Sequence, residues 1–306
     1  MRKSFVKALI ELAKKDKDVC LLTGDLGYHV FEEFVKEFPD RFFNCGISEQ
    51  NMVGMSAGLA LSGKKPYVYS IVPFATLRPF EQIRTDICYQ NLNVKIIGVG
   101  GGFSYGTLGS THIVLEDLAV MRALPNMTVL CPSDLFETEE LVLRSYEKSG
   151  PTYIRLTNAG QFKTYDQKPM LEIGKSKVLK DGKDGLIIAS GLQAGFSLEA
   201  ANELEKNGHN FKVISLHTIK PIDKKDILSH AKGINKIFVF EEHSIFGGVG
   251  SALAEIFLEA GWQGKFKSIG VPDEFSKDIG TADYLRKKYL IDKEGIIKII
   301  LKESLR

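Results

Sequence analysis

Cysteine is scarce in this chain of 306 residues, and its 4 cysteines lie far apart, each in an apolar setting. They are Cys20, Cys45, Cys88 and Cys131, and no two of them form a CxxC pair. Without such a pair a structural zinc site is not expected, and scattered single cysteines fit the reduced cytosol. We therefore expect a cytoplasmic protein that binds no metal through these side chains.

Long apolar runs and an excess of one charge are also missing. No segment approaches the roughly 18 consecutive apolar residues of a membrane span. The segment 1–18 carries charges throughout and predicts an amphipathic helix, unlike a signal peptide. The 40 basic and 38 acidic residues give a net charge of +2 without a long basic tract. We therefore expect a soluble protein that binds neither membranes nor nucleic acid.

Short apolar runs alternate with helical patterns through most of the sequence, whose apolar share of 44% is ample for two cores. The runs that predict buried strands are 19–22, 42–45, 67–72, 94–99, 127–130, 153–156, 186–189, 211–216, 237–240 and 266–269. The helices predicted between the later runs cover about 194–206, 223–231 and 251–260. This alternation predicts an α/β fold with mainly parallel, twisted sheets covered by helices on both faces.

A polar stretch, residues 158–168, interrupts the alternation and is typical of an interdomain connection. We therefore predict two α/β domains, residues 1–160 and 181–306, joined by a linker of residues 161–180.

Open parallel sheets bind ligands where the strands end. In the first predicted domain these loops are 23–29, 46–51, 72–78 and 98–112. Glu49 lies in one of them, at the start of a helix rich in small residues such as Gly54 and Gly58, which allow close approach of another surface. Taken alone, Glu49 could instead be a first-turn carboxylate favoured by the helix dipole, with Ser48 as N-cap.

The segment around Glu49, GISEQNMVGMSAGLA, resembles the one that carries the cofactor-activating glutamate in transketolases, deoxyxylulose-phosphate synthases and the β subunits of 2-oxoacid dehydrogenases. Further stretches resemble the same superfamily in the same order, over nearly the whole chain. They are SIVPFATLRPFEQIRTDICYQNLNVKIIG, GSTHIVLEDLAVMRALPNMTVLCPSD, VISLHTIKPID and FVFEEHSIFGGVGSALAE. The resemblance implies a pyrimidine-binding domain at 1–160 and a transketolase C-terminal domain at 181–306.

The resemblance implies that thiamine diphosphate is the cofactor and that its pyrimidine end binds here. Protonated Glu49, in an apolar pocket, would hydrogen-bond a ring nitrogen of the aminopyrimidine and so promote the reactive carbanion. Burial disfavours the charged form of a carboxyl group, so a protonated glutamate is physically reasonable. The cofactor carries the difficult chemistry, and the protein orients it.

Three further residues match cofactor-binding positions of the family. Phe74 matches the aromatic residue that stacks on the pyrimidine, although a core phenylalanine is an equal alternative. Leu77 and Ile71 stand at places that are often aromatic in transketolases, so we expect a more aliphatic ring pocket. Asp25 matches an acidic residue near the pyrimidine and the subunit interface, and could otherwise be an ordinary turn residue.

His112, in the sequence GSTH, matches a transketolase histidine that reaches the reacting carbon and assists proton transfer. Glu49 and His112 are therefore the predicted catalytic residues. The glycine-rich run before His112 departs from the common pattern near Gly100 and Leu108, where a histidine and an aspartate are expected. The donor and acceptor sugars are therefore left open.

The residues that the resemblance offers for substrate binding are Arg2, His29, Arg78, Tyr105 and Asn158. Arg2 aligns with a substrate-phosphate arginine of transketolases, and Arg78 resembles an arginine of the synthase branch. Guanidinium groups suit phosphate through bidentate geometry. His29 and Asn158 replace a serine and an arginine that commonly bind phosphate. Arg2 could equally be a terminal surface charge, and Arg78 the partner of Glu81.

The Gly-Asp-Gly motif and the later asparagine that normally hold the diphosphate through Mg²⁺ are not found in the sequence. Residues 248–250, Gly-Val-Gly, look like part of a dinucleotide loop, but Leu253 takes the third glycine place, which favours a packing turn. We therefore expect a separate N-terminal transketolase subunit to carry the diphosphate and Mg²⁺ ligands. Two copies of this chain, self-associated about a two-fold axis, would join two such subunits in an α2β2 assembly.

The sequence thus predicts the C-terminal subunit of a two-chain transketolase-like enzyme. It would transfer a two-carbon ketol unit from a ketose, free or phosphorylated, to an aldose. His112 favours this reaction over that of a 2-oxoacid dehydrogenase β subunit, which acts on a lipoyl carrier. A deoxyxylulose-phosphate synthase usually keeps all domains in one chain. A non-catalytic assembly or regulatory subunit is the remaining alternative, against which Glu49, Phe74 and His112 together argue.

Overall fold

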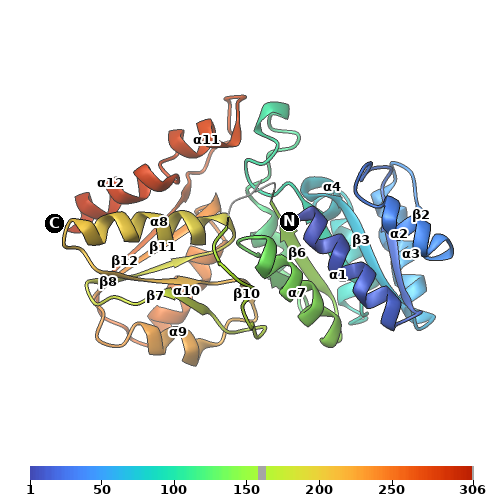
Figure 1. The fold of residues 1–306 in the computed structure, drawn as a ribbon, viewed down its shortest axis with the longest axis horizontal. Helices are drawn as coiled ribbons and strands as arrows, with labels where there is room; N and C mark the ends of the chain where they lie inside the picture. Colours follow the sequence, from blue (N-terminus) through green and yellow to red (C-terminus); the bar gives the residue numbers. More distant parts are fainter. Residues whose placement is uncertain (158–162, 305–306) are drawn as a thin grey trace.

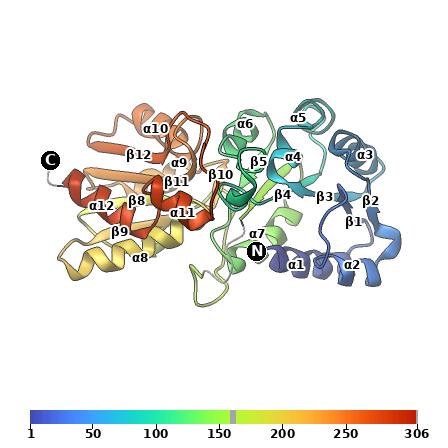
Figure 2. The same ribbon diagram turned by 90° about the horizontal axis from the view of Figure 1, so that it is seen from above.

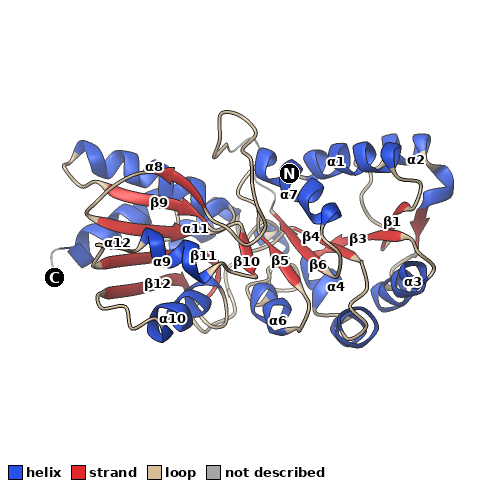
Figure 3. Cartoon of the chain, turned by 90° about the horizontal axis from the view of Figure 1, so that it is seen from below, coloured by secondary structure: helices blue, strands red, loops and turns tan. Residues whose placement is uncertain are grey.

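The protein folds into two mainly parallel β-sheets that lie side by side, as a computed structural model shows (Figure 1). The structure describes residues 1–157 and 163–304, so the predicted site residue Asn158 lies outside the described residues. Helices pack on both faces of each sheet (Figure 3). The α/β fold class predicted from the alternation of apolar runs and helical patterns is therefore confirmed.

The first sheet holds seven strands within the described residues, in the order β10-β5-β6-β4-β3-β1-β2. The strands are β1 (Val19–Thr23), β2 (Phe42–Asn44), β3 (Lys65–Ile71), β4 (Lys95–Val99), β5 (Thr128–Leu130), β6 (Thr152–Leu156) and β10 (Thr218–Lys220). All neighbours pair in parallel except β10, which is antiparallel to β5. Every residue of β1, β4 and β6 is buried, as expected for strands covered on both faces.

The helices of the first half cover both faces of this sheet. They are α1 (Arg2–Lys15), α2 (Glu32–Glu37), α3 (Glu49–Leu61), α4 (Val72–Thr76), α5 (Phe80–Gln82), α6 (Asp117–Ala123) and α7 (Leu135–Glu147). Helices α1, α2 and α7 lie on one face, and α3, α4 and α6 lie on the other (Figure 3). Helix α1 is amphipathic, and Phe5, Leu9 and Leu12, spaced by three or four residues, form its buried side.

The second sheet has the order β12-β11-β8-β9-β7 and is parallel except for its edge strand β7. Its strands are β7 (Lys177–Lys180), β8 (Gly185–Ala189), β9 (Phe211–Ser215), β11 (Lys236–Ser244) and β12 (Lys265–Val271). Its helices are α8 (Leu192–Lys206), α9 (Lys224–His230), α10 (Val249–Glu259), α11 (Ala282–Lys288) and α12 (Lys293–Ser304). Helices α8 and α12 lie on one face, and α9 and α10 lie on the other (Figure 3).

Two short strands depart from the sequence-based description. Residues 177–180, which the sequence places in the linker, form β7 and pair with β9. β10 follows the second-half strand β9 but pairs with β5 of the first sheet. Both are antiparallel edge strands of three or four residues, too short to show a hydrophobic period. Their place depends on tertiary pairing that local sequence does not encode.

The two halves are joined around Glu242, on β11. Its Oε1 accepts a hydrogen bond from the backbone N–H of Phe103 at 2.7 Å, and its main-chain oxygen accepts one from Arg155 Nη2 at 3.0 Å. Gly102 has φ of +64°, and a Cβ there would lie 2.3 Å from the Glu242 carboxylate. The loop that carries Tyr105 and His112 is therefore anchored by the second half, as the adjoining segments in Figure 2 show.

Within the described part of the chain, no helix is both long enough and apolar enough to cross a bilayer.

Candidate active site

Glu49 is a buried carboxylate at the carboxyl end of the first sheet. It occupies the first turn of α3 and is only 1% exposed. Its Oε1 accepts a hydrogen bond from Ser70 Oγ at 3.2 Å, and Ser70 lies near the end of β3. Ser48 stands at the N-cap position, but its hydroxyl donates to the Cys45 carbonyl oxygen and caps nothing. Glu49 is therefore held against β3 and is more than a first-turn helix residue.

Two residues that support Glu49 are absent from the sequence-based site. One is Ser70, a hydroxyl in the otherwise apolar strand KPYVYSI, and that contrast is a signal that could have found it. The other is Gly24, at the end of β1, where an added Cβ would lie 3.2 Å from Glu49 Oε1. That distance is tighter than ordinary packing, so glycine keeps the space beside the carboxylate open.

Arg78 is the ionic partner of Glu49. Its Nη1 lies 2.6 Å from Glu49 Oε2, across a sequence separation of 29 residues. The same guanidinium lies over the ring of Phe74, with its carbon 4.3 Å from the ring centroid. The Arg78 side chain is 42% exposed, so this cation reaches from the surface down to a buried anion. The structure thus pairs Arg78 with Glu49, and Glu81 is not the carboxylate that it contacts here.

Phe74 also contacts the loop that carries His112. Their rings meet edge to face, with centroids 5.3 Å apart and an interplanar angle of 73°. Tyr105 meets His112 in the same way at 6.3 Å, and Thr111 Oγ1 lies 2.9 Å from His112 Nδ1. A continuous row of contacts therefore links Glu49, through Arg78 and Phe74, to His112 and Tyr105.

The glycine-rich run before His112 is required by this packing. At Gly100, φ is +83°, and a Cβ would lie 2.0 Å from the ring of Tyr105. Only glycine fits there without moving Tyr105.

Asp25 and Leu77 lie at the rim of the same sheet edge. Asp25 has φ of +56°, and its Oδ1 accepts hydrogen bonds from Tyr28 Oη at 3.1 Å and Asn44 Nδ2 at 2.9 Å. Leu77, directly after α4, is 42% exposed. Both side chains are therefore available at the surface to a second polypeptide or a ligand.

Arg2 lies beside the buried hydroxyl of Tyr69. Burial raises the pKa of Tyr69, and the neighbouring Arg2 guanidinium partly offsets that rise. Met1 Sδ accepts a hydrogen bond from Thr157 Oγ1 at 3.2 Å, which places the start of α1 beside the end of β6. Arg2 thus lies near the segment that leads to Asn158.

His29 is placed differently from Arg2. Its φ is +61°, and it lines a groove of about 650 Å³ between α1 and α2, together with Lys7 and Glu33. The contacts that link Glu49 to Tyr105 run through Arg78, Phe74 and His112, and His29 has no part in them.

The Gly-Val-Gly segment at 248–250 is a packing turn. Glu241 Oε2 and Oε1 accept hydrogen bonds from the backbone N–H groups of Val249 and Gly250, at 2.7 and 2.8 Å. The start of α10 is thus already occupied by a carboxylate of the protein itself, and burial raises the pKa of Glu241. A Cβ at Gly250 would lie 1.8 Å from Ser268 Oγ. This turn therefore offers no place for a dinucleotide phosphate.

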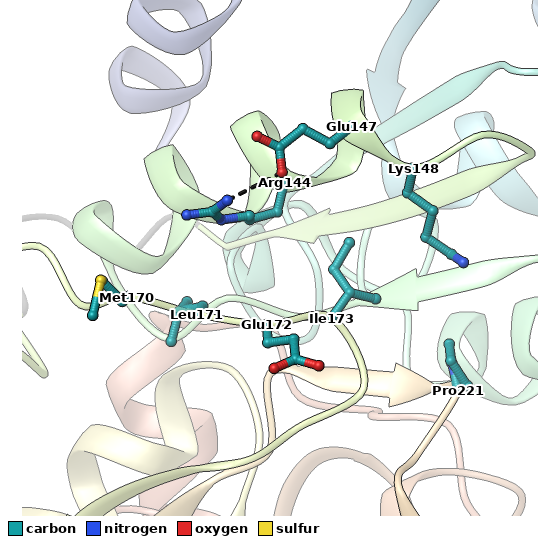
Figure 4. A pocket seen from close by; sticks show the side chains of 8 residues that line it. All are labelled: Arg144, Glu147, Lys148, Met170, Leu171, Glu172, Ile173 and Pro221. Atoms are coloured by element: carbon teal, nitrogen blue, oxygen red, sulfur yellow. Dashed lines mark hydrogen bonds and ion pairs between the residues drawn. The ribbon is translucent and has the colours of Figure 1, made fainter.

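A surface hollow of about 600 Å³ lies elsewhere, between the end of α7 and residues 170–173 (Figure 4). Arg144 and Glu147, joined by an ion pair of 3.1 Å, border it. None of the predicted site residues that the structure describes lines this hollow. Among the described residues there is also no group of three or more His, Cys, Asp or Glu side chains that could hold a metal ion.

Comparisons with known proteins agree over almost the whole chain. Residues 1–159 match the transketolase pyrimidine-binding domain, and residues 174–296 match the transketolase C-terminal domain. A putative transketolase C-terminal section from Methanocaldococcus jannaschii is 41% identical, over 99% of this chain and 96% of its own length. An apulose-4-phosphate transketolase subunit from Phocaeicola vulgatus is 39% identical, over 98% and 96%. A solved structure, a split gene transketolase described as an inactive beta4 tetramer, superposes with a TM-score of 0.89 at 37% identity, over 98% and 96%.

The two matched domains and the two mainly parallel sheets define the α/β fold of the transketolase class. The chain belongs to the transketolase family, and within it to the C-terminal subunits of split transketolases. The resemblance stated from the sequence is thereby confirmed.

The residues around Glu49 fit the aminopyrimidine end of thiamine diphosphate. The Arg78 guanidinium shows that a planar group with N–H donors can lie on the Phe74 ring and reach the Glu49 carboxylate at the same time. An aminopyrimidine is also planar, and its ring nitrogens and amino group can pair with a carboxyl group.

Proposed function

We propose that this chain is the C-terminal subunit of a two-chain enzyme that transfers a two-carbon ketol unit from a ketose to an aldose. The observation that carries the proposal is the row of contacts that joins buried Glu49 to His112 across the ring of Phe74. It brings an acidic group, an aromatic platform and a second proton-transfer group together at one edge of the sheet. When bound, thiamine diphosphate supplies the carbon nucleophile that breaks the C2–C3 bond of the ketose.

Glu49 holds and orients the aminopyrimidine in this proposal. Its buried carboxyl, fixed by Ser70 on β3, would hydrogen-bond a ring nitrogen while the ring lies on Phe74. The hydrogen bond to that ring nitrogen requires a proton on the carboxyl. Asp25 and Leu77 would border the ring from the exposed side.

His112 moves protons at the substrate oxygens. It stands on the anchored loop, with Phe74 on one side and Tyr105 on another, and Thr111 Oγ1 beside its Nδ1. That hydrogen bond leaves Nε2 as the nitrogen for the substrate. A histidine held in this way suits general acid–base work near neutral pH.

The substrate anion would bind near Arg2. Arg2 and Tyr105 both lie close to Tyr69, so two of the predicted substrate-binding residues that the structure describes belong to one region. The relative from Phocaeicola vulgatus is named for apulose-4-phosphate, which supports a phosphorylated sugar as donor or acceptor. His29 would bind a more distant part of the substrate or none of it.

A separate N-terminal subunit would bind the diphosphate and Mg²⁺, with the cofactor between the two polypeptides. The solved relative that covers the same two domains is described as an inactive beta4 tetramer, which supports a chain that self-associates yet needs another subunit for activity. We propose a cytoplasmic α2β2 assembly.

A comparison of donor substrates tests this proposed function. The chain is mixed with the partner subunit that copurifies with it, and cleavage of a pentulose phosphate, apulose-4-phosphate and a sulfonated ketose is compared with decarboxylation of 2-oxoacids. We expect ketose cleavage with an aldose acceptor and no lipoyl-dependent decarboxylation, because His112 is placed for the hydroxyl groups of a sugar. Decarboxylation without ketose cleavage would refute the proposal.

His112→Asn in the same complex should lower kcat about 100-fold, the lower end of the range for a lost general acid–base group. The affinity for thiamine diphosphate should stay unchanged, because the contacts of His112 with Phe74, Tyr105 and Thr111 do not involve Glu49. Steady-state kinetics and calorimetric titration of the cofactor measure the two quantities. His209→Gln, on a histidine of the second half, is the control, and an equal kcat in the two variants would remove His112 from the mechanism.

A further inference from the structure

Arg78 makes both of the contacts that the proposed cofactor ring needs. Its guanidinium lies over Phe74 at 4.3 Å, and its Nη1 donates to Glu49 Oε2 at 2.6 Å. Guanidinium is flat, delocalised and weakly hydrated, so it stacks on aromatic faces while it donates hydrogen bonds in its own plane. An aminopyrimidine is also flat, and its ring nitrogen would accept a hydrogen bond from the protonated Glu49 carboxyl. Both groups therefore compete for the same pair of protein side chains.

The ion pair explains how Glu49 can be buried in the free chain. A carboxylate that is 1% exposed is costly unless a cation or hydrogen-bond donors compensate its charge. Ser70 donates one hydrogen bond at 3.2 Å, and Arg78 supplies the cation. The same guanidinium occupies Glu49 Oε2 and the face of the Phe74 ring, the two contacts that are proposed for the cofactor ring. Arg78 and the working site are therefore mutually exclusive at Glu49.

Arg78 is the partner that can leave. Glu49 is fixed by its place in α3 and by Ser70, and its side chain is 1% exposed. The Arg78 side chain is 42% exposed and follows the end of α4, so it can swing into solvent without moving a core element.

We propose that Arg78 is an internal occupant of the aminopyrimidine subsite, which holds Glu49 paired in the free chain and is displaced when the cofactor ring enters. This inference rests on the proposed function and deepens it, because it assigns Arg78 a positioning role at the cofactor and not the substrate-phosphate role implied by the family resemblance. Entry of the cofactor ring and separation of the Glu49–Arg78 ion pair would then occur in a single step.

The test measures thiamine binding to the full-length chain by ligand-observed NMR. Thiamine carries the aminopyrimidine without a phosphate, and 4-methyl-5-thiazoleethanol is the control probe without a pyrimidine. Arg78→Gln should bind thiamine about tenfold more tightly than wild type, equivalent to roughly 1.4 kcal/mol. Arg84→Gln, an exposed arginine shortly after α5, should bind it as wild type does. Binding of the thiazole probe should be the same in all variants.

A second substitution at the same position shows whether a change in thiamine affinity comes from a folding defect. Arg78→Lys keeps the positive charge but loses the planar guanidinium group. Its affinity for thiamine should therefore lie between those of wild type and Arg78→Gln. Thermal unfolding of each variant shows that the comparison is made on folded protein. A loss of stability alone would not raise affinity for a ligand.

The outcomes separate this inference from the proposed function. If Arg78→Gln binds thiamine no better than wild type while the two-chain complex still cleaves ketoses, Arg78 is not an occupant and the proposed function stands. If Arg78→Gln weakens thiamine diphosphate but leaves thiamine unchanged, Arg78 is a phosphate ligand and the inference is wrong. If no variant binds thiamine and the complex cleaves no ketose, both fail together.

Discussion

Glu49→Gln is expected to lower the kcat of the two-chain complex about 10⁴-fold, the upper end of the range for a lost proton-transfer group. Glutamine keeps the length and branching of the side chain, so the packing beside Gly24 and Ser70 is retained. What it loses is the carboxyl proton that the aminopyrimidine nitrogen would accept. The effect should appear in kcat at saturating thiamine diphosphate and Mg²⁺, since the reacting carbon is no longer activated.

A second measurement separates chemistry from binding in this variant. Exchange of the thiazolium C2 proton for deuterium, followed by NMR, should slow by a factor similar to that in kcat. Glu81→Gln is the matched control, because Glu81 is an exposed carboxylate on the neighbouring helix α5. If Glu49→Gln retains wild-type exchange and turnover, Glu49 has no role in activation, whatever its burial.

The same substitution bears on Arg78. Without a carboxylate, the guanidinium loses its ionic partner and keeps only its stacking on Phe74. Glu49→Gln should therefore not weaken cofactor binding as strongly as it weakens turnover. A parallel fall in both would indicate that Glu49 mainly binds the ring.

Much of the site was predictable because strand ends and helix starts are local features. The loops 46–51, 72–78 and 98–112 follow apolar runs that the structure places in one sheet, so Glu49, Phe74 and His112 had to meet at its carboxyl edge. The small residues that follow Glu49 draw attention to it, and the family resemblance supplies its expected role. The row of contacts from Glu49 to His112 agrees with that prediction.

The ionic partner of Glu49 could not be predicted from local sequence features. Arg78 lies 29 residues away on another segment, and the sequence offered only the nearer carboxylate Glu81 as its partner. Pairing depends on how α3 and the end of α4 pack, and that is a tertiary property. Strand β10 could not be predicted for the same reason, because its pairing with β5 joins the two halves of the chain and is a tertiary contact.

The contacts by which the second half of the chain holds the loop of the first half could also not be predicted from the sequence. Glu242 receives the Phe103 N–H and lies against Gly102, which together fix the loop that leads to His112. A glycine-rich run is compatible with many loops, and only the fold shows which atoms need the space. The position of His112 thus depends on residues more than a hundred positions away.

This chain alone, given thiamine diphosphate and Mg²⁺, should cleave no ketose above the buffer background, and addition of the N-terminal subunit should restore turnover. The physical reason is that a pyrimidine site without a diphosphate site holds only one end of the cofactor. The Gly-Asp-Gly motif and the later asparagine that normally hold the diphosphate through Mg²⁺ are not found in the sequence. The contacts to the diphosphate would then be missing. The aminopyrimidine ring would also have to displace Arg78 without the binding energy of those contacts.

Two measurements decide this prediction. Calorimetric titration should show weak cofactor binding to the chain alone and tight, Mg²⁺-dependent binding to the mixture. A coupled ketose-cleavage assay should give activity that rises with added partner until the chains are equimolar, as an α2β2 assembly requires. Turnover by the purified single chain would mean that it holds the diphosphate itself, and a partner with no Gly-Asp-Gly motif that still restored activity would contradict the proposed division of the site. The proposed requirement for a second chain and the proposed role of Glu49 rest on the same division of the site, because a carboxyl group can activate a ring only when something else holds the rest of the molecule in place.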